Sequence, residues 1–267
     1  MYSKEYLVGT VEPIVRQAGA ILMAHFGKPV AYQEKPGSGA SGVSLVTEAD
    51  LASEKLLISE IGRAFPDAAF FAEESGAIGS KEYCFVIDPL DGTTNFVHGL
   101  PYFCISVAVT LQGEPFFGMI YNPILDEMYY AYKGQGAYLN GKKLAVTEEQ
   151  QFSKAVCVVG LPYAKGQRYM ALLEMLKKIS PKLYTFRHFG AAALDLAYVA
   201  RGSLDGVFLA DLGWWDVAAG TLLIEEAGGK ATDFEGKIVR SDFNSVVAGS
   251  KPMHSHLKEL LKESFRV

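Results

Sequence analysis

The chain has 267 residues, of which 49% are hydrophobic and 21% charged, so it can form a large core in one domain or in two closely packed subdomains. Its net charge of −5 argues against a nucleic-acid partner. No apolar run approaches the ~20 residues of a membrane span, and the first residues lack the apolar core of a signal peptide. We therefore expect a cytoplasmic protein with no membrane partner.

The cysteine content argues against a disulfide framework. Cys84, Cys104 and Cys157 are odd in number, form no close pair and lie within apolar runs. We expect them to be buried as small apolar side chains.

Two amphipathic helices are predicted near the N-terminus. Apolar residues recur at helical spacing over residues 3–26, and Gly27 and Pro29 end the pattern. A second helix is predicted to run from Thr47 to Phe65, with Thr47 as N-cap and Asp50 in the third position of a capping box. Between them, residues 35–44 contain three glycines and three serines, which predicts a flexible connection or a lid.

Two short apolar segments then lead into acidic residues. Residues 70–72 precede Glu73-Glu74, and the predicted strand 83–87 precedes Asp88. We expect the two acidic ends to meet at one edge of a sheet. A single acidic pair would otherwise be a solvated strand end.

The stretch from Asp88 to Asn95 combines features of a metal site with those of a phosphate site. Asp88 and Asp91 are three residues apart, and Pro89 restricts the backbone between them. Gly92 permits close backbone approach, and Asp91 is a candidate cap for a short helix whose first amides would face an anion. The alternative is a capped turn with solvated acids.

The remaining chain predicts layered α+β or α/β packing. Strands over 103–111, 115–121 and 127–132 have the spacing of an antiparallel meander, and Asn140-Gly141 is a strong hairpin signal. Strands and helices then alternate. Strands are predicted at 155–159, 206–210 and 245–248, and helices at 166–179, 191–200, 216–226 and 256–263. The change of pattern places a subdomain boundary near Glu149, which separates residues 1–149 from 150–267.

The candidate functional residues are acids at strand-to-helix junctions: Glu73, Asp88, Asp91 and Asp216, with Asp50 at a helix start. Oxygen ligands without a His/Cys cluster favour Mg²⁺ or Mn²⁺ over zinc, and two such ions can activate water against a phosphate ester. The Thr93 hydroxyl could orient that water if Asp50 accepts its proton. Helix capping alone would also explain Asp50 and Asp216.

Two segments, Asp88-Pro-Leu-Asp-Gly-Thr-Thr-Asn-Phe96 and Trp215-Asp-Val-Ala-Ala-Gly220, closely resemble the signatures of the inositol monophosphatase family. Residues 73–76 and 226–229 match as well. The resemblance implies an αβαβα five-layer sandwich and Mg²⁺-dependent, Li⁺-sensitive phosphomonoester hydrolysis with two or three ions per site. It also implies a homodimer.

The same resemblance implies roles for individual residues. The metal ligands are Glu73, Asp88, Asp91, Asp216 and the carbonyl of Leu90, and the catalytic residues are Asp50, Thr93 and Glu73. Substrate contacts are expected from Asp91, Gly92, Thr93, Gly190, Ala191, Ala192 and Asp216.

The pocket for the substrate alcohol departs from the family pattern. Leu209 stands where a glutamate is usual in inositol phosphatases, with Asp211 two residues later, and Ala191 replaces a frequent hydroxyl-bearing residue. Lys35 is a candidate for the family's loop lysine. We expect an inositol-1-monophosphatase with broad specificity for sugar and polyol phosphates. Alternatives are fructose-1,6-bisphosphatase, 3'-phosphoadenosine 5'-phosphate phosphatase, histidinol-phosphate phosphatase, or a regulatory protein that binds transcription or RNA machinery.

Overall fold

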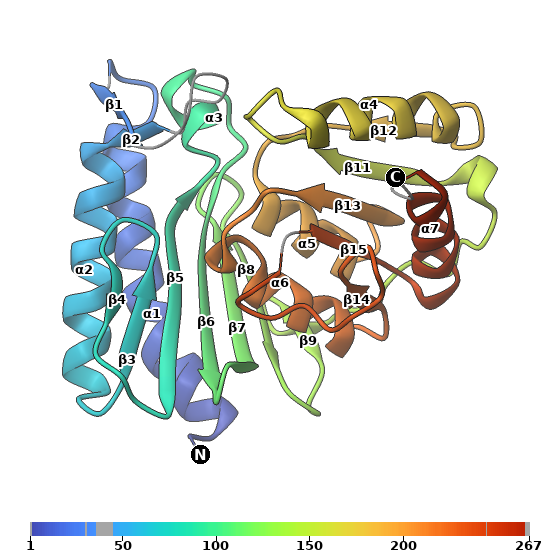
Figure 1. Cartoon of the computed structure of the whole chain (residues 1–267). Helices are drawn as coiled ribbons and strands as arrows, with labels where there is room; N and C mark the ends of the chain where they lie inside the picture. The colour runs from blue at the N-terminus through green and yellow to red at the C-terminus, as the bar shows by residue number, and fades with distance from the viewer. Residues whose placement is uncertain (1, 30, 36–44, 244, 265–267) are drawn as a thin grey trace.

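Helices and sheets alternate in five layers in the computed structural model, which describes residues 2–29, 31–35, 45–243 and 245–264 (Figure 1). The order of the layers is a helix pair, an eight-stranded sheet, a second helix pair, a five-stranded sheet and a third helix pair. The predicted αβαβα sandwich is therefore confirmed.

The first layer consists of α1 (Lys4–His25) and α2 (Glu48–Ala64). The Ser3 hydroxyl caps α1 by accepting from the Tyr6 N–H, and Thr47 and Asp50 form the predicted capping box of α2. Before α2, strands β1 (Tyr32–Glu34) and β2 (Leu45–Thr47) form an antiparallel pair. Residues 36–44 of the predicted loop lie outside the described residues.

The eight-stranded sheet has the strand order β10-β9-β8-β7-β6-β5-β3-β4, in which only β3 and β5 run parallel. The predicted meander is its centre. Its strands are β3 (Ala69–Ala72), β4 (Gly76–Ile78), β5 (Tyr83–Asp91), β6 (Cys104–Leu111), β7 (Glu114–Asn122), β8 (Glu127–Tyr132), β9 (Ala137–Leu139) and β10 (Lys142–Lys143).

Strand β5 extends four residues beyond the predicted end at Ile87. Its pairing with β6 continues across a register shift between Asp88 and Asp91, and Pro89 lies inside that irregularity. A bulge of this kind tolerates a proline that lacks an N–H. The short helix α3 (Thr93–Val97) follows, as predicted.

The middle layer, α5 (Ala192–Ala200) and α6 (Trp214–Glu226), packs between the two sheets. Close approach of α6 to the first sheet requires Gly118 of β7, because a Cβ there would lie 2.9 Å from the Cα of Ala219. The predicted start of α6 at Asp216 was wrong by one half turn, since the helix begins at Trp214.

The five-stranded sheet has the order β12-β11-β13-β15-β14 and is covered on its outer face by α4 (Gln167–Ile179) and α7 (Lys251–Ser264). Pro252 lies in the first turn of α7, where proline is tolerated, so α7 begins five residues before the prediction. The strands are β11 (Val156–Gly160), β12 (Thr185–Arg187), β13 (Gly206–Ala210), β14 (Lys230–Thr232) and β15 (Ser245–Gly249), and a single 3₁₀ turn (Phe152–Lys154) precedes them.

Helix α1 is the one helix among the described residues that is long and apolar enough to cross a membrane, by length and composition alone. Its residues Leu7, Val11, Val15 and Leu22 are fully buried in the core between α1, α2 and the first sheet. Core helices of this kind pass the same test of length and composition.

The three cysteines are free thiols, as expected. Cys104 and Cys157 are buried, whereas Cys84 is partly exposed. The strands of the two sheets come from separate stretches of chain, but α5 and α6 pack on both sheets. The division at residue 149 therefore stays a prediction.

Candidate metal centre and active site

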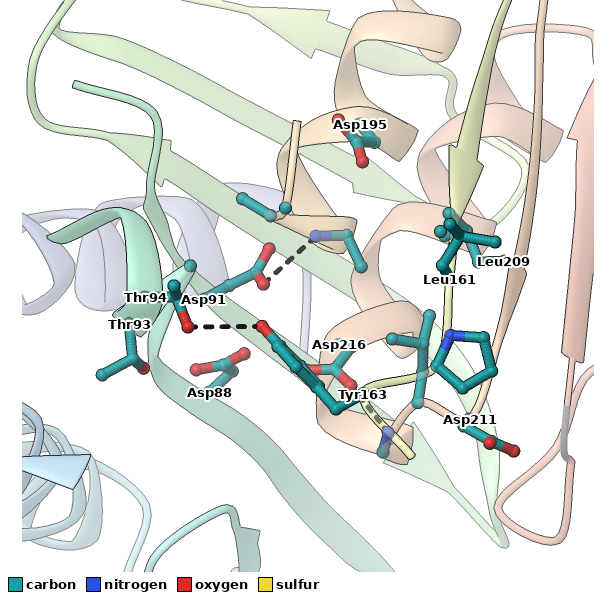
Figure 2. Close-up of a pocket in the computed structure, with 18 of the residues that line it drawn as sticks. Asp88, Asp91, Thr93, Thr94, Leu161, Tyr163, Asp195, Leu209, Asp211 and Asp216 are labelled. Carbon is teal, nitrogen blue, oxygen red and sulfur yellow. Dashed lines mark hydrogen bonds between the residues drawn. The ribbon is translucent and has the colours of Figure 1, made fainter. Parts of the chain in front are cut away.

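A pocket of about 590 Å³ opens where the two halves of the chain meet (Figure 2). Its floor comes from the end of β5 and from α3, and its walls come from the starts of α5 and α6 and the loop after β11. Of the predicted site residues, Glu73, Asp88, Leu90, Asp91, Gly92, Thr93, Gly190, Ala191, Ala192 and Asp216 all line this pocket.

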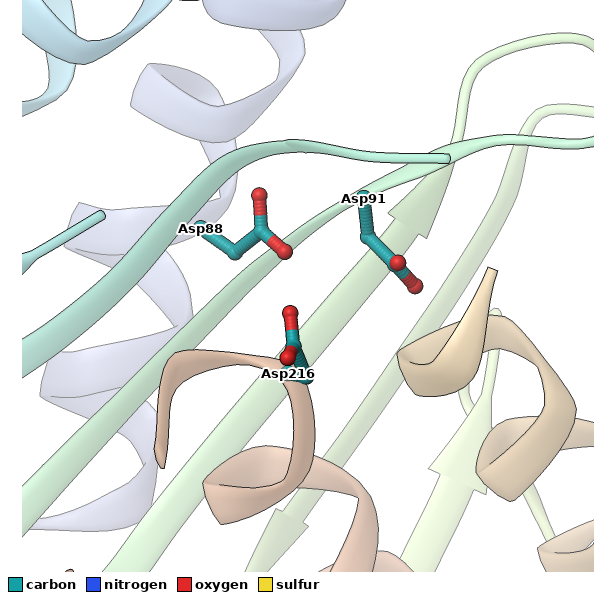
Figure 3. Close-up of side chains that lie close together, drawn as sticks. All are labelled: Asp88, Asp91 and Asp216. Carbon is teal, nitrogen blue, oxygen red and sulfur yellow. The ribbon is translucent and has the colours of Figure 1, made fainter. Parts of the chain in front are cut away.

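Three carboxylates converge on the pocket floor (Figure 3). Oxygen atoms of Asp88, Asp91 and Asp216 lie within 4.8 Å of one another. Asp88 and Asp91 come from the irregular end of β5, and Asp216 comes from the first turn of α6. The bulge in β5 thus places two acids of one strand beside an acid 125 residues later in the chain.

Backbone amides hold each of these carboxylates in place. Asp88 Oδ1 accepts from the N–H of Leu90 at 3.0 Å. Asp91 accepts from the N–H groups of Ala192 at 3.1 Å and Ala193 at 2.7 Å, the start of α5. The prediction that Asp91 caps α3 was wrong, because Gly92 is the N-cap and the Asp91 side chain points to α5 instead.

Asp216 is also not an N-cap. It stands in the third position of α6, and its Oδ2 accepts from the N–H of Gly213 at 2.6 Å. The paired tryptophans that precede Asp216 therefore belong to the helix. The hydrogen bond of Asp216 to the N-cap residue Gly213 uses only Oδ2, which leaves Oδ1 for the pocket floor.

Burial raises the pKa of each of the three carboxyl groups, Asp88, Asp91 and Asp216, above the usual value for an aspartate. For Asp88 and Asp216 burial is the largest cause, and the nearby acids Glu73 and Asp91 raise the pKa of both further. For Asp91 burial raises the pKa to about 7, although the Ala192 and Ala193 amides act in the opposite direction. Crowded, buried acids of this kind are expected where a cation supplies the missing positive charge.

Glu73 borders the same pocket and is paired with a lysine. Its backbone N–H donates to the Ile87 carbonyl at 3.1 Å, and the parallel β3–β5 pairing thereby confirms that the two acidic strand ends meet. Lys35 Nζ lies 2.5 Å from Glu73 and 2.6 Å from Glu74. Burial opposes the charge on Lys35, but the two glutamates outweigh it and raise the lysine's pKa.

Asp50 and Thr93 form the predicted pair. The Thr93 hydroxyl lies 3.1 Å from both Asp50 Oδ1 and the Leu90 carbonyl and can donate to either. Asp50 Oδ2 accepts from the backbone N–H of Thr47 at 2.9 Å and from its hydroxyl. Burial raises the pKa of Asp50 to about 6 despite these hydrogen bonds. Asp50 is therefore both a helix cap and a candidate base.

Gly92 connects β5 to α3 in a conformation that favours glycine, with φ of 94°. A Cβ there would lie 3.0 Å from the Tyr102 carbonyl oxygen and 3.1 Å from the Cβ of Ala191. The predicted need for close backbone approach at this position is met, and α3 is thereby pressed against the start of α5.

The comparisons with known proteins agree with this geometry. The model of the inositol monophosphatase family matches residues 4–266, which is nearly the whole chain. The chain belongs to the inositol monophosphatase family. This is a phosphatase family whose members are typically metal-dependent.

Relatives within the inositol monophosphatase family have different names. The chain is 35% identical to an inositol-1-monophosphatase of Mesorhizobium japonicum over 98% of both chains. It is also 35% identical to the Nus factor SuhB of Escherichia coli, over 94% of this chain and 95% of that one. The crystal structure of the extragenic suppressor protein suhB from Bartonella henselae superposes with a TM-score of 0.90 at 35% identity, covering 96% of this chain and 98% of that chain.

The outer wall of the pocket contains Leu209 and Asp211, two of the positions at which the alcohol pocket of this member of the inositol monophosphatase family was expected to differ. Leu209 is buried on β13 and lines the pocket, and Asp211 is ion-paired with Arg168. The N–H of Ala192 is already donated to Asp91.

Several pocket residues were missed by sequence reasoning: Tyr163, Lys165, Tyr169 and His188. Tyr163 reaches across the pocket to Thr94, with 3.5 Å between their hydroxyls (Figure 2). Tyr163 and Lys165 follow strand β11, Tyr169 lies in the first turn of α4, and His188 follows β12. For Tyr163 and Lys165 the position after the carboxyl end of a predicted strand was the available signal.

The donor set fits a hard divalent cation. Within the described residues the converging atoms are carboxylate oxygens, with no histidine among them, and such donors suit Mg²⁺ or Mn²⁺. One thiol borders this set: Cys104 Sγ lies 3.6 Å from Asp91 Oδ2, within hydrogen-bond range. Burial and neighbouring acids raise the pKa of that thiol, so it is a neutral neighbour.

Proposed function

We propose that this protein is a Mg²⁺-dependent phosphomonoester hydrolase. The observation that carries the proposal is the convergence of Asp88, Asp91 and Asp216 within 4.8 Å on the floor of a pocket. Membership of a phosphatase family supports the same reaction class.

Five groups of the chain would hold two or three Mg²⁺ ions, or Mn²⁺ in their place: the carboxylates of Glu73, Asp88, Asp91 and Asp216 and the carbonyl of Leu90. When bound, such ions lower the pKa of water and stabilise negative charge on the oxygens of a phosphate ester. The ion pair of Glu73 with Lys35 uses the Oε1 atom of the glutamate, which leaves Oε2 for a cation.

The chain's own residues provide a proton path. The Thr93 hydroxyl accepts a proton from the attacking water and passes its own proton to Asp50 Oδ1, 3.1 Å away. A carboxyl with a pKa of about 6 is well matched to base catalysis near neutral pH. The water oxygen bonds to phosphorus as the bond from phosphorus to the alcohol oxygen breaks. The departing alkoxide takes up a proton from solvent, and Asp50 releases its proton to solvent before the next turnover.

Backbone amides at the start of α3 would position the ester, because the first amides of α5 are already donated to Asp91. We assign phosphate binding to the N–H groups of Gly92 and Thr93, with Gly190, Ala191 and Ala192 along the opposite wall. Asp91 and Asp216 would face both the cations and the substrate oxygens.

For the substrate we propose inositol 1-phosphate together with other sugar and polyol phosphates. Leu209 and Ala191 offer no side-chain partner for the alcohol hydroxyls, and a site without such partners discriminates weakly. Fructose 1,6-bisphosphate, 3'-phosphoadenosine 5'-phosphate and histidinol phosphate are the alternative substrates. We also propose that Li⁺ inhibits the hydrolysis, that the protein forms a homodimer and that it is located in the cytoplasm.

A second candidate function is that of a regulatory protein that binds transcription or RNA machinery. Relatives named Nus factor SuhB, at 35% identity over most of the chain, favour it. The net charge of −5 speaks against direct contact with nucleic acid, so the partner would be a protein.

The deciding experiment is a phosphate-release panel with Mg²⁺ over all of the substrates named above. Wild-type protein should hydrolyse inositol 1-phosphate, and Asp88→Asn should lose hydrolysis at saturating Mg²⁺ because the central carboxylate is gone. The exposed Asp67→Asn carries the same charge change and should retain activity. Wild-type turnover in Asp88→Asn would refute the metal assignment.

A further inference from the structure

Helix α2 has three buried polar residues within about one turn, on the side that faces the pocket floor. Asp50, Ser53 and Glu54 are at most 3% exposed, and they occupy positions i, i+3 and i+4 of the helix. The same face continues with the apolar Leu57 and Ile61, so this polar turn interrupts a core-facing surface. Burial of three polar side chains is costly unless each has partners.

Each of the three side chains is hydrogen-bonded to a different segment near the pocket: α3, the irregular end of β5 and the turn after β3. Asp50 accepts from Thr93, and the Ser53 hydroxyl donates to the Pro89 carbonyl at 3.0 Å. Glu54 accepts from the backbone N–H of Glu74 at 2.8 Å and from the hydroxyl of Ser75. The helix therefore connects the turn after β3 to the irregular end of β5.

The contacts of Glu54 fix the backbone on one side of Glu73. On the other side, Ala72 pairs with Ile87, and the Glu73 N–H itself donates to the Ile87 carbonyl. Glu73 is thus held between strand β5 and helix α2. Among the described residues Glu54 forms no ion pair, so its carboxylate is balanced only by the hydrogen bonds that it accepts from this turn.

We propose that Glu54 is a positioning residue for cation binding: it fixes the Glu73–Ser75 turn so that the Glu73 carboxylate is directed at the cluster of Asp88, Asp91 and Asp216. Glu54 itself touches neither cation nor substrate. The inference rests on the proposed function, because it assigns Glu73 to the cation site.

The test is titration of the purified full chain with MgCl₂ by calorimetry, without substrate. Glu54→Leu removes both acceptors and should weaken Mg²⁺ binding about tenfold, because it leaves the Glu74 N–H and the Ser75 hydroxyl without their partner. Glu54→Gln keeps an acceptor for Glu74 and a polar partner for Ser75, and should bind within about twofold of wild type.

Glu226 provides a matched control. Its carboxylate accepts from the N–H groups of Gly134 and Gly136 and so clasps a turn in the same way, but that turn does not line the pocket. Glu226→Leu should lower stability and leave Mg²⁺ affinity unchanged. A general loss of structure would affect both leucine variants alike.

Turnover gives a second readout. If Glu54 only positions Glu73, the activity of Glu54→Leu should return toward the wild-type kcat as Mg²⁺ is raised, whereas general damage would lower kcat at every Mg²⁺ concentration. Should Glu54→Leu fail to fold, Ser75→Ala decides, with an expected weakening of about threefold from one lost hydrogen bond.

The outcomes separate the two proposals. Wild-type protein that binds no Mg²⁺ refutes the proposed function itself. Wild-type protein that binds Mg²⁺, together with a folded Glu54→Leu or Ser75→Ala of unchanged affinity, overturns the positioning role and leaves the proposed function intact.

Discussion

At the scale of single residues, Asp50 combines two functions that the sequence left as alternatives. One carboxylate oxygen completes the capping box with Thr47, and the other lies 3.1 Å from the Thr93 hydroxyl. The cap fixes the rotamer, and burial raises the pKa to about 6. A side chain that is locked by its own helix loses little further freedom when it acts as a base.

Two variants should separate these functions. Asp50→Asn retains an acceptor for the Thr47 N–H but cannot take a proton, so kcat should fall by about 10² or more while thermal stability changes little. Thr47→Ala removes the cap and should cost about 1 kcal/mol of unfolding free energy while most activity remains. Phosphate release and thermal denaturation measure the two effects. Normal turnover by Asp50→Asn would show that Asp50 acts only as a helix cap and not as a base.

At the scale of elements, the junction of β5 with α3 depends on Gly92. A side chain there faces two costs, a backbone with φ of 94° and contacts near 3 Å with Tyr102 and Ala191. Gly99 shares the positive φ, at 69°, but an added Cβ would meet nothing within 4 Å. The pair therefore distinguishes backbone strain from crowding.

Gly92→Ala should destabilise the protein by about 3 kcal/mol, and Gly99→Ala by about 1 kcal/mol, because only the first adds steric overlap to backbone strain. Denaturant unfolding gives both values. Gly92→Ala should also lower phosphatase activity, since α3 and α5 must separate to admit the methyl group. Equal destabilisation by the two variants would show that crowding at residue 92 does not affect the unfolding free energy.

The elements also mark where sequence reasoning was sufficient. Helical periodicity and caps located α1 and α2, and alternating apolar residues located the meander, because local pattern and burial agree there. The three-residue strands β1, β4, β12 and β14 were not predicted. Each is too short to show an alternating pattern, and β1, β12 and β14 exist through pairing with segments more than ten residues away.

The candidate site shows the same limit. The signature residues identified Asp88, Asp91 and Asp216, but not which backbone amides hold them. Asp91 was expected at α3 and instead binds the start of α5, a contact across about a hundred residues of chain that no local rule contains. Glu54 had a usable signal, a polar residue on the core-facing side of α2, four residues after Asp50.

At the scale of the whole molecule, buried titratable groups make stability depend on pH in opposite directions. His254 of α7 is 1% exposed, and its Nε2 lies 2.8 Å from the Thr232 hydroxyl. Burial, with Lys230 and Lys258 nearby, lowers the pKa of His254 to about 4. The pocket acids Asp88 and Asp216 have raised pKa values, so their effect on the pH dependence of the unfolding free energy is opposite in sign to that of His254.

The sign for His254 follows from linkage. The pKa of His254 is lower in the folded chain than in the unfolded one, so the unfolded chain takes up the proton first as the pH falls. The contribution of His254 to the unfolding free energy is therefore fully present above a pH of about 6.5 and is lost as the pH falls toward 4. The difference in unfolding free energy between wild type and His254→Gln should therefore shrink over that range. Urea unfolding at several pH values measures it, and parallel profiles would contradict the assignment.

The separation of Asp91 and Asp216 along the chain has a consequence for synthesis on the ribosome. Residues 1–149 contain four of the five proposed ligand groups, but the amides that hold Asp91 and the third acid of the cluster arrive with residues 192–216. A nascent chain that has released only the eight-stranded sheet would hold Asp91 without its amide partners and would lack Asp216. The proposed cation would therefore bind the completed site most tightly and would stabilise the finished protein more than its first half.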